Sequence, residues 1–414
     1  MEKKFFGYKA VIGAFLIMFI ELGTATTLGV FLASLSADSG FPITTCAYIG
    51  TACTVSCVIF SMVASKLMAK GISLRTMVLI GLIANALGML CYTFAIPNNV
   101  ISLVFFYLGG FLVGIALTFS AHAVCGAIIA SWFVEDREKL MGMVFSGAGF
   151  GAAIVVFIAG QMFKFFTWRQ CYYILAAFTI IVGFLVAFFL IRDPAKMGQK
   201  PKGWDTVKAT SDTEAVELPG MSLGEARKSK SYWLFAVMLL FVCCAGAGFT
   251  SYAPAWWQTV GGMSSTSAAS YQSIYLIVSG LILLVVGAVF KKIGPVFFAI
   301  IVFGGYALCN ILTSAYTGQS GLLIMTLILG AIGYPLQASI PSLCGQSIFG
   351  PREFGAISAS LMTFNYLGQF LYAPVMSVCG MKLGWIVYGI LTLIGLAILL
   401  VAIGASPYRK SLKQ

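Results

Sequence analysis

Long apolar runs, each ended by a short polar or charged segment, fill almost the whole of the 414-residue chain. A membrane-spanning helix needs roughly 20 apolar residues. A helix satisfies its own backbone hydrogen bonds in lipid, whereas an isolated strand does not. The pattern therefore predicts an all-α integral membrane protein with twelve transmembrane helices, near residues 8–35, 45–68, 76–96, 100–131, 140–163, 171–191, 232–254, 267–290, 295–315, 321–346, 355–378 and 385–405.

Composition supports this interpretation and excludes several other classes of protein. Hydrophobic residues make up 60% of the chain and charged residues 9%, whereas soluble domains carry about 25% charged residues. The eleven cysteines lie mostly inside apolar runs and have neither metal-ligand nor disulfide spacing. The sequence also lacks a phosphate-binding loop and paired catalytic acids. We therefore predict no metal, no cofactor and no enzymatic activity.

The distribution of basic residues predicts the orientation. The one long polar segment, Arg192–Lys230, holds 8 of the 25 Lys and Arg residues. With the N-terminus placed inside, 22 of these 25 residues fall in cytoplasmic segments. Cytoplasmic loops of membrane proteins collect Lys and Arg, so we expect a multi-pass protein of the cell membrane with both termini in the cytoplasm. The net charge of +12 then needs no nucleic-acid partner.

The two sides of the central polar segment resemble each other. Each side has six predicted spans, a short basic loop after its second span and an Arg/Glu loop after its fourth. The predicted organisation is an N-terminal six-helix half (1–191), a cytoplasmic central loop (192–231) and a C-terminal six-helix half (232–414). Such repeats in transporters place the substrate near the middle of the membrane, between the repeats.

This arrangement resembles the major facilitator superfamily over the whole chain. The superfamily's loop after the second helix is approximately Gly-x-x-x-Asp-Arg/Lys-x-Gly-x-Arg. Ala69 and Lys291 stand where the acid is expected. The resemblance implies a gating role for the loop residues that remain, together with the arginines after the fourth span of each half: Lys70, Gly71, Arg75, Arg137 and Arg352.

A closer resemblance appears at 132–151, WFVEDREKLMGMVFSGAGFG. It is similar to the Trp-Phe-x3-Arg-x4-Gly pattern and glycine-rich fifth helix of the oxalate/formate antiporter and monocarboxylate porter group. The matching residues are Trp132, Phe133, Arg137, Gly142, Gly147, Gly149 and Gly151. The glycines permit close approach of helices, so packing alone also explains them.

The same resemblance sets a limit on the substrate. Members that carry oxalate have an Arg on the eighth helix and a Lys on the eleventh, where this chain has Leu283 and Leu361. A dicarboxylate would therefore lack a strong partner. We expect instead a monocarboxylate-type metabolite, or a weakly charged or neutral solute.

Two ionisable residues lie deep inside predicted spans. They are Glu21, in the first span, and His122, the only histidine, in the fourth. A charge in the middle of the membrane costs at least about 2.5 kcal/mol, so such residues are candidates for function. Glu21 could carry a proton or hold a cationic group of the substrate, and His122 could donate or accept a proton. For each, a hydrogen-bonded structural role is the alternative. The resemblance implies that both helices line the central cavity.

Polar side chains at helical spacing form a second group of candidates. Tyr275 and Gln272 lie in the eighth span, Tyr334 and Gln337 in the tenth, and Asn365 and Gln369 in the eleventh. A polar face in lipid must turn inward, and helix–helix hydrogen bonding explains it as well as ligand contact does. Tyr252, Trp256 and Trp257 end the seventh span as an interfacial belt or a cavity wall. Arg169 lies at the outer boundary, where it either attracts an anion or extends to the interface.

These observations predict a secondary transporter that works by alternating access on a small organic solute, by proton coupling or exchange. Its partners are then a small-molecule substrate, the lipid bilayer and protons, and we expect a monomer. The alternative is a sensor or receptor on the same scaffold that binds ligand without transporting it.

Overall fold

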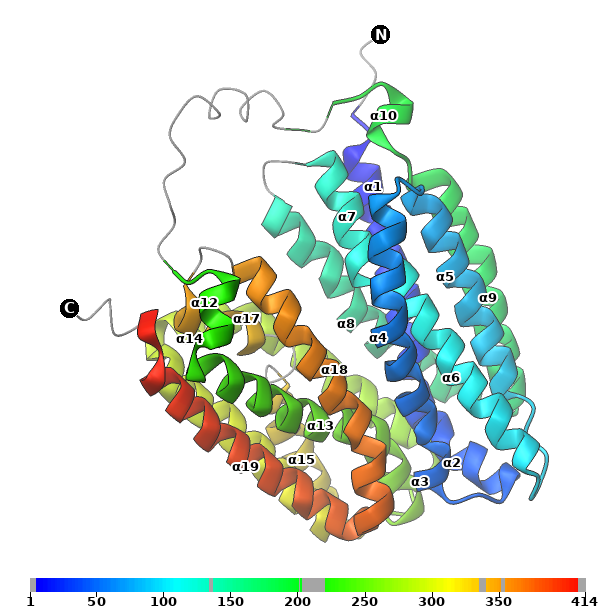
Figure 1. Ribbon diagram of the computed structural model, residues 1–414. Helices are drawn as coiled ribbons and strands as arrows, with labels where there is room; N and C mark the ends of the chain where they lie inside the picture. Colours follow the sequence, from blue (N-terminus) through cyan, green and yellow to red (C-terminus); the bar gives the residue numbers. More distant parts are fainter. Residues whose placement is uncertain are drawn as a thin grey trace, which may run out of the picture. The chain divides into compact units, whose positions relative to one another are not determined.

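The computed structural model describes residues 5–133, 137–200, 202, 220–334, 340–350 and 354–408. Helices joined by short turns make up most of this part of the chain (Figure 1). The apolar runs of the sequence therefore fold as expected, and the predicted all-α class is confirmed.

In the part of the chain that the structure describes, ten helices lie before residue 200, the last of them at the start of the central loop. Their bounds are α1 Gly7–Thr26, α2 Leu28–Ser39, α3 Ile43–Cys46, α4 Tyr48–Ala69, α5 Leu74–Tyr92, α6 Val100–Ser120, α7 His122–Trp132, α8 Arg137–Met162, α9 Trp168–Leu190 and α10 Pro194–Met197. Those that follow are α12 Leu223–Lys228, α13 Lys230–Thr259, α14 Ser265–Ala315, α15 Ser320–Gly333, α17 Ile340–Phe349, α18 Phe354–Cys379 and α19 Met381–Ala405.

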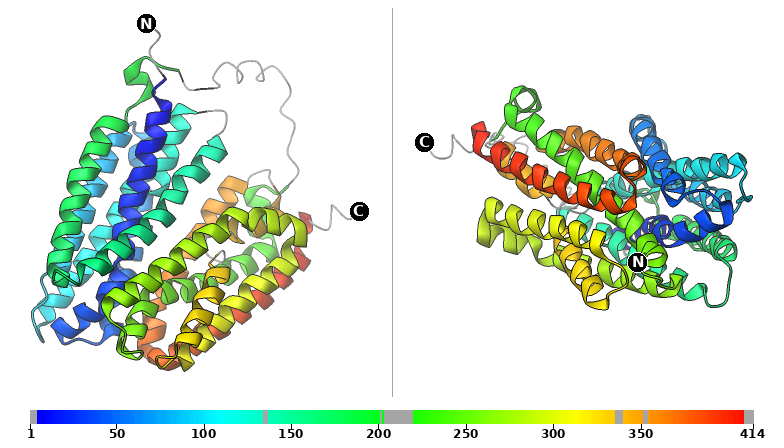
Figure 2. Two further views of the ribbon diagram at one scale, coloured as in Figure 1. Left: turned by 180° about the vertical axis from the view of Figure 1, so that it is seen from behind. Right: turned by 90° about the horizontal axis from the view of Figure 1, so that it is seen from below.

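Over the described residues, each predicted span consists largely of helix. Within the described residues, ten helical stretches are long and apolar enough to cross a membrane. The other two predicted spans, 321–346 and 355–378, are occupied by α15 with α17 and by α18. The long helix α14 contains two predicted spans and changes direction at Gly294, whose φ of 77° is left-handed. Its two parts run side by side after this turn (Figure 2, left).

The chain forms two compact units. One lies within Met1–Ala215 and includes Ser265–Ser273, and the other lies within Val216–Ser264 and Ile274–Gln414. In the N-terminal unit α1 packs on α8, α9 and α7, while α6 packs on α4 and α5 (Figure 1). In the C-terminal unit α13 packs on α18 and α19.

Glycines allow the closest of these helix contacts. A Cβ atom added to Gly147 of α8 would lie 2.6 Å from the backbone oxygen of Phe15 in α1. One added to Gly151 would collide with the backbone of Phe19, one turn further along α1. These two glycines of the 132–151 motif thus have a packing role, since any side chain would push α1 and α8 apart.

The two ends of the central loop are attached to different units. The backbone N–H of Phe6 donates to Oε1 of Gln199 at 3.0 Å, beside α10 and the start of α1. At the other end the N–H of Met221 donates to the carbonyl of Phe349 at 2.8 Å. Ser222 and Glu225 then form a capping box that begins α12.

Candidate functional site

Glu21 lies near the end of α1 and is fully buried within the N-terminal unit. Among the side chains that the structure describes, it is the only buried Asp, Glu, Lys, Arg or His. Nδ2 of Asn85, on α5, donates a hydrogen bond to Oε2 of Glu21 at 2.7 Å.

The donors around Glu21 are already used. Nδ2 of Asn85 also donates to Oγ1 of Thr24 at 2.9 Å, and Thr24 itself donates to the carbonyl of Ile20 at 2.8 Å. Ser120 lies beside the carboxylate, but its hydroxyl donates to the carbonyl of Ala116 at 2.6 Å. Oε1 of Glu21 has no hydrogen-bond partner in the described part of the chain. Of these donors only Ser120, whose hydroxyl can rotate, could also serve a charged carboxylate.

The fourth predicted span is broken beside this network. Helix α6 ends at Ser120 and α7 begins at His122, with Ala121 between them at φ −92° and ψ −132°. The side chain of His122 lies outside the described atoms, so its predicted role as a proton donor or acceptor stays a prediction. Interrupted helices in transporters expose backbone groups that bind substrates and ions. A helix break next to a buried carboxyl group is thus a feature expected of a substrate-binding or ion-binding site.

Over its described residues, the C-terminal unit buries a cluster of aromatic side chains and no Asp, Glu, Lys, Arg or His. Phe249 of α13 lies at its centre, with its ring centroid 5.4 Å from that of Tyr275, 6.0 Å from Tyr306 and 5.9 Å from Trp385. The hydroxyl groups of Tyr275 and Tyr306 have no hydrogen-bond partner among the described residues. A buried polar atom without a partner is unfavourable, so a ligand or water molecule would be stabilised there.

Several predicted site residues lie close to this cluster or to each other. The rings of Tyr275 and Tyr334 are 6.1 Å apart. Gln272 is buried, and both polar atoms of its amide lack a partner within the described ranges. On α18, Nε2 of Gln369 donates to Oδ1 of Asn365 at 2.6 Å. Gln337 lies outside the described residues.

Aromatic residues at the end of α13 are buried rather than interfacial. Tyr252 and Trp257 are almost fully buried, and Nε1 of Trp256 donates to the carbonyl of Thr313 at 3.0 Å. The expected interfacial belt is therefore wrong for these three residues. Their rings fill the C-terminal unit next to the cluster around Phe249.

The first basic loop has a structural role that the structure makes visible. Gly71 has a φ of +76°, and the N–H groups of Gly71 and Ile72 donate to the carbonyls of Met68 and Leu67. This is a Schellman motif that ends α4 and requires glycine. Nε of Arg75 donates to the carbonyl of Ile191 at 2.8 Å and so ties α5 to the end of α9. Lys70 is exposed.

Other gating candidates lie beyond what the structure describes. Arg352 and the side chain of Arg137 are both outside the described atoms, so their predicted roles stay predictions.

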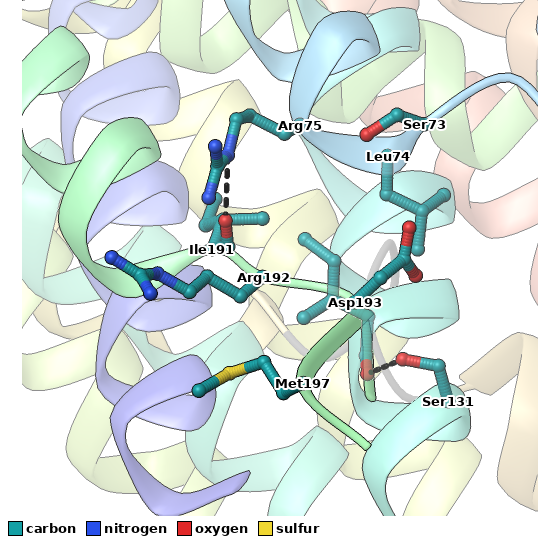
Figure 3. Close-up of a pocket in the computed structure, with 9 residues that line it drawn as sticks. Ser73, Leu74, Arg75, Ser131, Ile191, Arg192, Asp193 and Met197 are labelled. Carbon is teal, nitrogen blue, oxygen red and sulfur yellow. Dashed lines mark hydrogen bonds between the residues drawn. The ribbon is translucent and has the colours of Figure 1, made fainter. Parts of the chain in front are cut away.

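Two cavities lie in the N-terminal unit where α5 begins and α9 ends, and Glu21 lines neither of them. One has a volume of about 370 Å³, with Ser73, Ser131 and Asp193 in its wall (Figure 3). The other has a volume of about 560 Å³ and an apolar wall from α9. Arg75 and Arg192 line both cavities.

Comparison with known proteins decides the family. The sequence pattern of the Major Facilitator Superfamily matches residues 14–373. The chain belongs to this superfamily. It is therefore a multi-pass membrane protein of a transporter family. Comparison with curated protein sequences finds no match.

Solved structures of facilitators share this fold. A bacterial homologue of the human lysosomal transporter Spinster, inward-facing and occupied, has a TM-score of 0.74 at 14% identity, covering 97% of this chain and 98% of its own. The nucleoside transporter NupG has a TM-score of 0.70 at 13% identity, covering 98% and 99%. A D-xylose-proton symporter has a TM-score of 0.69 at 12% identity, covering 97% and 98%. At these identities the likeness concerns the fold alone.

In this facilitator Arg169 is held by protein groups. Its Nη1 lies 2.6 Å from Oδ2 of Asp38, and its Nη2 donates to the carbonyl of Ala95 at 2.9 Å. Nε1 of Trp168 donates to the same Asp38 oxygen at 2.8 Å. These contacts join the ends of α2 and α5 to the start of α9. The guanidinium of Arg169 is already paired with Asp38, so it is not free to bind an anion from solution.

Sequence reasoning missed the partners of Glu21. Asn85 is the only Asn, Gln or charged residue in the predicted span 76–96. Asn85 is a candidate on the same physical ground as Glu21, because an amide in lipid also needs a partner. Tyr306 and Phe249 gave no comparable signal, since aromatic residues are common throughout the apolar runs.

Proposed function

We propose that this protein is a secondary transporter of a small monocarboxylate-type metabolite, with Glu21 as the group that carries a coupling proton. The observation that carries the proposal is the Glu21 network. One carboxylate oxygen accepts from Asn85, while the other has no hydrogen-bond partner among the described residues. The hydroxyl of Ser120 beside this carboxyl group can accept a hydrogen bond from its protonated form or donate one to its charged form. A proton on Oε1 could then be gained and released without disturbing the contact to Asn85.

Proton coupling also fits the lack of a buried cation. No lysine or arginine is among the buried side chains of the described residues. A monocarboxylate that crosses together with one proton carries no net charge, so the pair needs no buried cation to offset its charge. The hydroxyl groups of Tyr275 and Tyr306 are donors that a carboxylate could use. The resemblance of residues 132–151 to the oxalate/formate antiporter and monocarboxylate porter group favours the same substrate class.

The orientation follows from the distribution of basic residues. We place the protein in the cytoplasmic membrane as a monomer with both termini inside. Contacts at one end of the N-terminal unit support this placement, because Gln199, Arg75 and Ile191 bring the predicted cytoplasmic segments together. Asp38 and Arg169 gather the predicted outer segments at the opposite ends of the same helices.

Uptake by purified protein in liposomes tests the proposal. A panel of labelled monocarboxylates would be compared with oxalate, with and without an imposed proton gradient. We expect wild-type uptake of a monocarboxylate to rise when the outside is more acidic. Glu21→Gln should lower this gradient-driven uptake at least tenfold, yet keep its fold because the new amide can donate to Ser120. Glu225→Gln, in the exposed capping box of α12, is the matched control.

Two results would count against the proposal. Gradient-driven uptake that survives Glu21→Gln would exclude Glu21 as the proton carrier. Ligand-induced stabilisation without any flux, for wild type and control alike, would favour the sensor or receptor instead.

A further inference from the structure

A groove on the surface of the N-terminal unit has an apolar wall and a basic end. It has a volume of about 560 Å³ and lies between the start of α5 and the last turns of α9. Ile181, Leu185 and Phe189 in its wall are 61%, 54% and 64% exposed. Exposed apolar side chains on a membrane helix face lipid. The apolar wall of this groove therefore faces the lipid bilayer.

Two arginines end this groove, and neither has an acidic partner among the described residues. Arg75 uses its Nε for the carbonyl of Ile191, and its guanidinium lies 5.9 Å from the ring centroid of Phe188. The guanidinium of Arg192 lies 5.6 Å from the ring centroid of Phe6. Across the described ranges, neither arginine forms a salt bridge. Figure 3 shows both guanidinium groups extending to one side, away from the carboxylate of Asp193.

We propose that this groove binds one anionic phospholipid, with its phosphate between Arg75 and Arg192 and an acyl chain along α9. Guanidinium groups hold phosphate oxygens through paired hydrogen bonds, and those of arginine suit such contacts better than lysine does. Two uncompensated positive charges above an apolar groove match a negative headgroup attached to an apolar chain. A zwitterionic lipid fits the apolar wall equally well but gains less from the arginines. The site lies apart from Glu21 and is independent of the proposed transport function.

Native mass spectrometry of the intact protein in mild detergent tests this assignment. Phosphatidylglycerol and phosphatidylcholine with identical acyl chains would be titrated separately. We expect one phosphatidylglycerol to bind about tenfold more tightly than phosphatidylcholine. Arg75→Gln with Arg192→Gln should remove that preference. Lys291→Gln with Lys292→Gln takes the same charge from exposed positions in the C-terminal unit and should leave it unchanged.

A second variant keeps the test valid if loss of Arg75 disturbs α9. Leu185→Trp leaves both arginines in place and fills the groove, so it should weaken phosphatidylglycerol binding about tenfold. Equal binding by the arginine pair variant and the lysine pair variant would overturn the proposal, as would unchanged binding by Leu185→Trp. Displacement of the lipid by millimolar inorganic phosphate would also overturn it, because the site would then recognise an anion alone.

Discussion

The two units use the same kind of helix packing but bury different chemistry. In the N-terminal unit α1 meets α8 where Gly151 lies against the backbone of Phe19. In the C-terminal unit α13 meets α18 where Gly368 lies against the backbone of Leu240. Each is the first helix of its half packed on the fifth predicted span. The duplicated feature is thus the close backbone contact, which depends on shape alone.

The buried polar groups differ between the units. The first contains the carboxylate of Glu21 with its amide partner Asn85, while the second contains tyrosine rings around Phe249. Two units can share a mode of packing and still bury different polar groups, because the two properties rest on different residues. Under the proposed function, this difference assigns proton carriage to the first unit and substrate recognition to the second.

The largest expected effect comes from breaking the shared packing. Gly151→Val and Gly368→Val should each lower the free energy of unfolding by about 3 kcal/mol, because backbone atoms cannot move aside for the new side chain. Gly149→Val and Gly280→Val are the controls, since a Cβ at either position meets no atom within 4 Å. Denaturant unfolding in detergent would measure this. Equal stability of Gly151→Val and Gly149→Val would show that the packing is not the shared feature.

A smaller effect should separate the two units. Asn85→Leu removes both donated hydrogen bonds at Glu21 and Thr24, and should cost about 2 kcal/mol because buried acceptors stay unpaired. Asn310 of α14 is just as buried but donates only to the carbonyl of Tyr306, one turn earlier. That carbonyl lies within a helix, so Asn310→Leu should cost less than about 1 kcal/mol. Thermal unfolding in detergent would compare them. If Asn310→Leu cost as much stability as Asn85→Leu, the hydrogen bonds of Asn85 to Glu21 and Thr24 would not be the reason for the effect.

These differences mark what the sequence could predict. The twelve spans followed from run length, and Glu21 followed from the cost of a charge in lipid. The contact of Glu21 with Asn85 joins residues 64 positions apart, and it depends on how each helix is rotated, which an apolar run does not encode. The helix break at Ala121 could not be predicted, because no proline or glycine lies next to this residue. Tertiary packing decides both features.

Tyrosine hydroxyl groups in the C-terminal unit provide a third test. The hydroxyl of Tyr388 donates to the carbonyl of Tyr372 at 2.7 Å, so Tyr388→Phe should cost about 1 kcal/mol. Tyr306→Phe removes a hydroxyl without a described partner and should change stability by less than about 0.5 kcal/mol. If the cluster recognises substrate, Tyr306→Phe should instead raise the KM for uptake severalfold. An unchanged KM would remove Tyr306 from the proposed recognition surface.

The smallest effect is expected at the ion pair of the N-terminal unit. The side chains of Arg169 and Asp38 are 34% and 39% exposed, so water weakens their attraction. Asp38→Asn keeps an oxygen that can accept from Trp168 and Arg169, and should cost about 0.5 kcal/mol at low salt and less at high salt. Melting temperatures of wild type and variant at two salt concentrations would measure this. A loss that persists at high salt would show that Asp38 acts through hydrogen bonds to Trp168 rather than through charge.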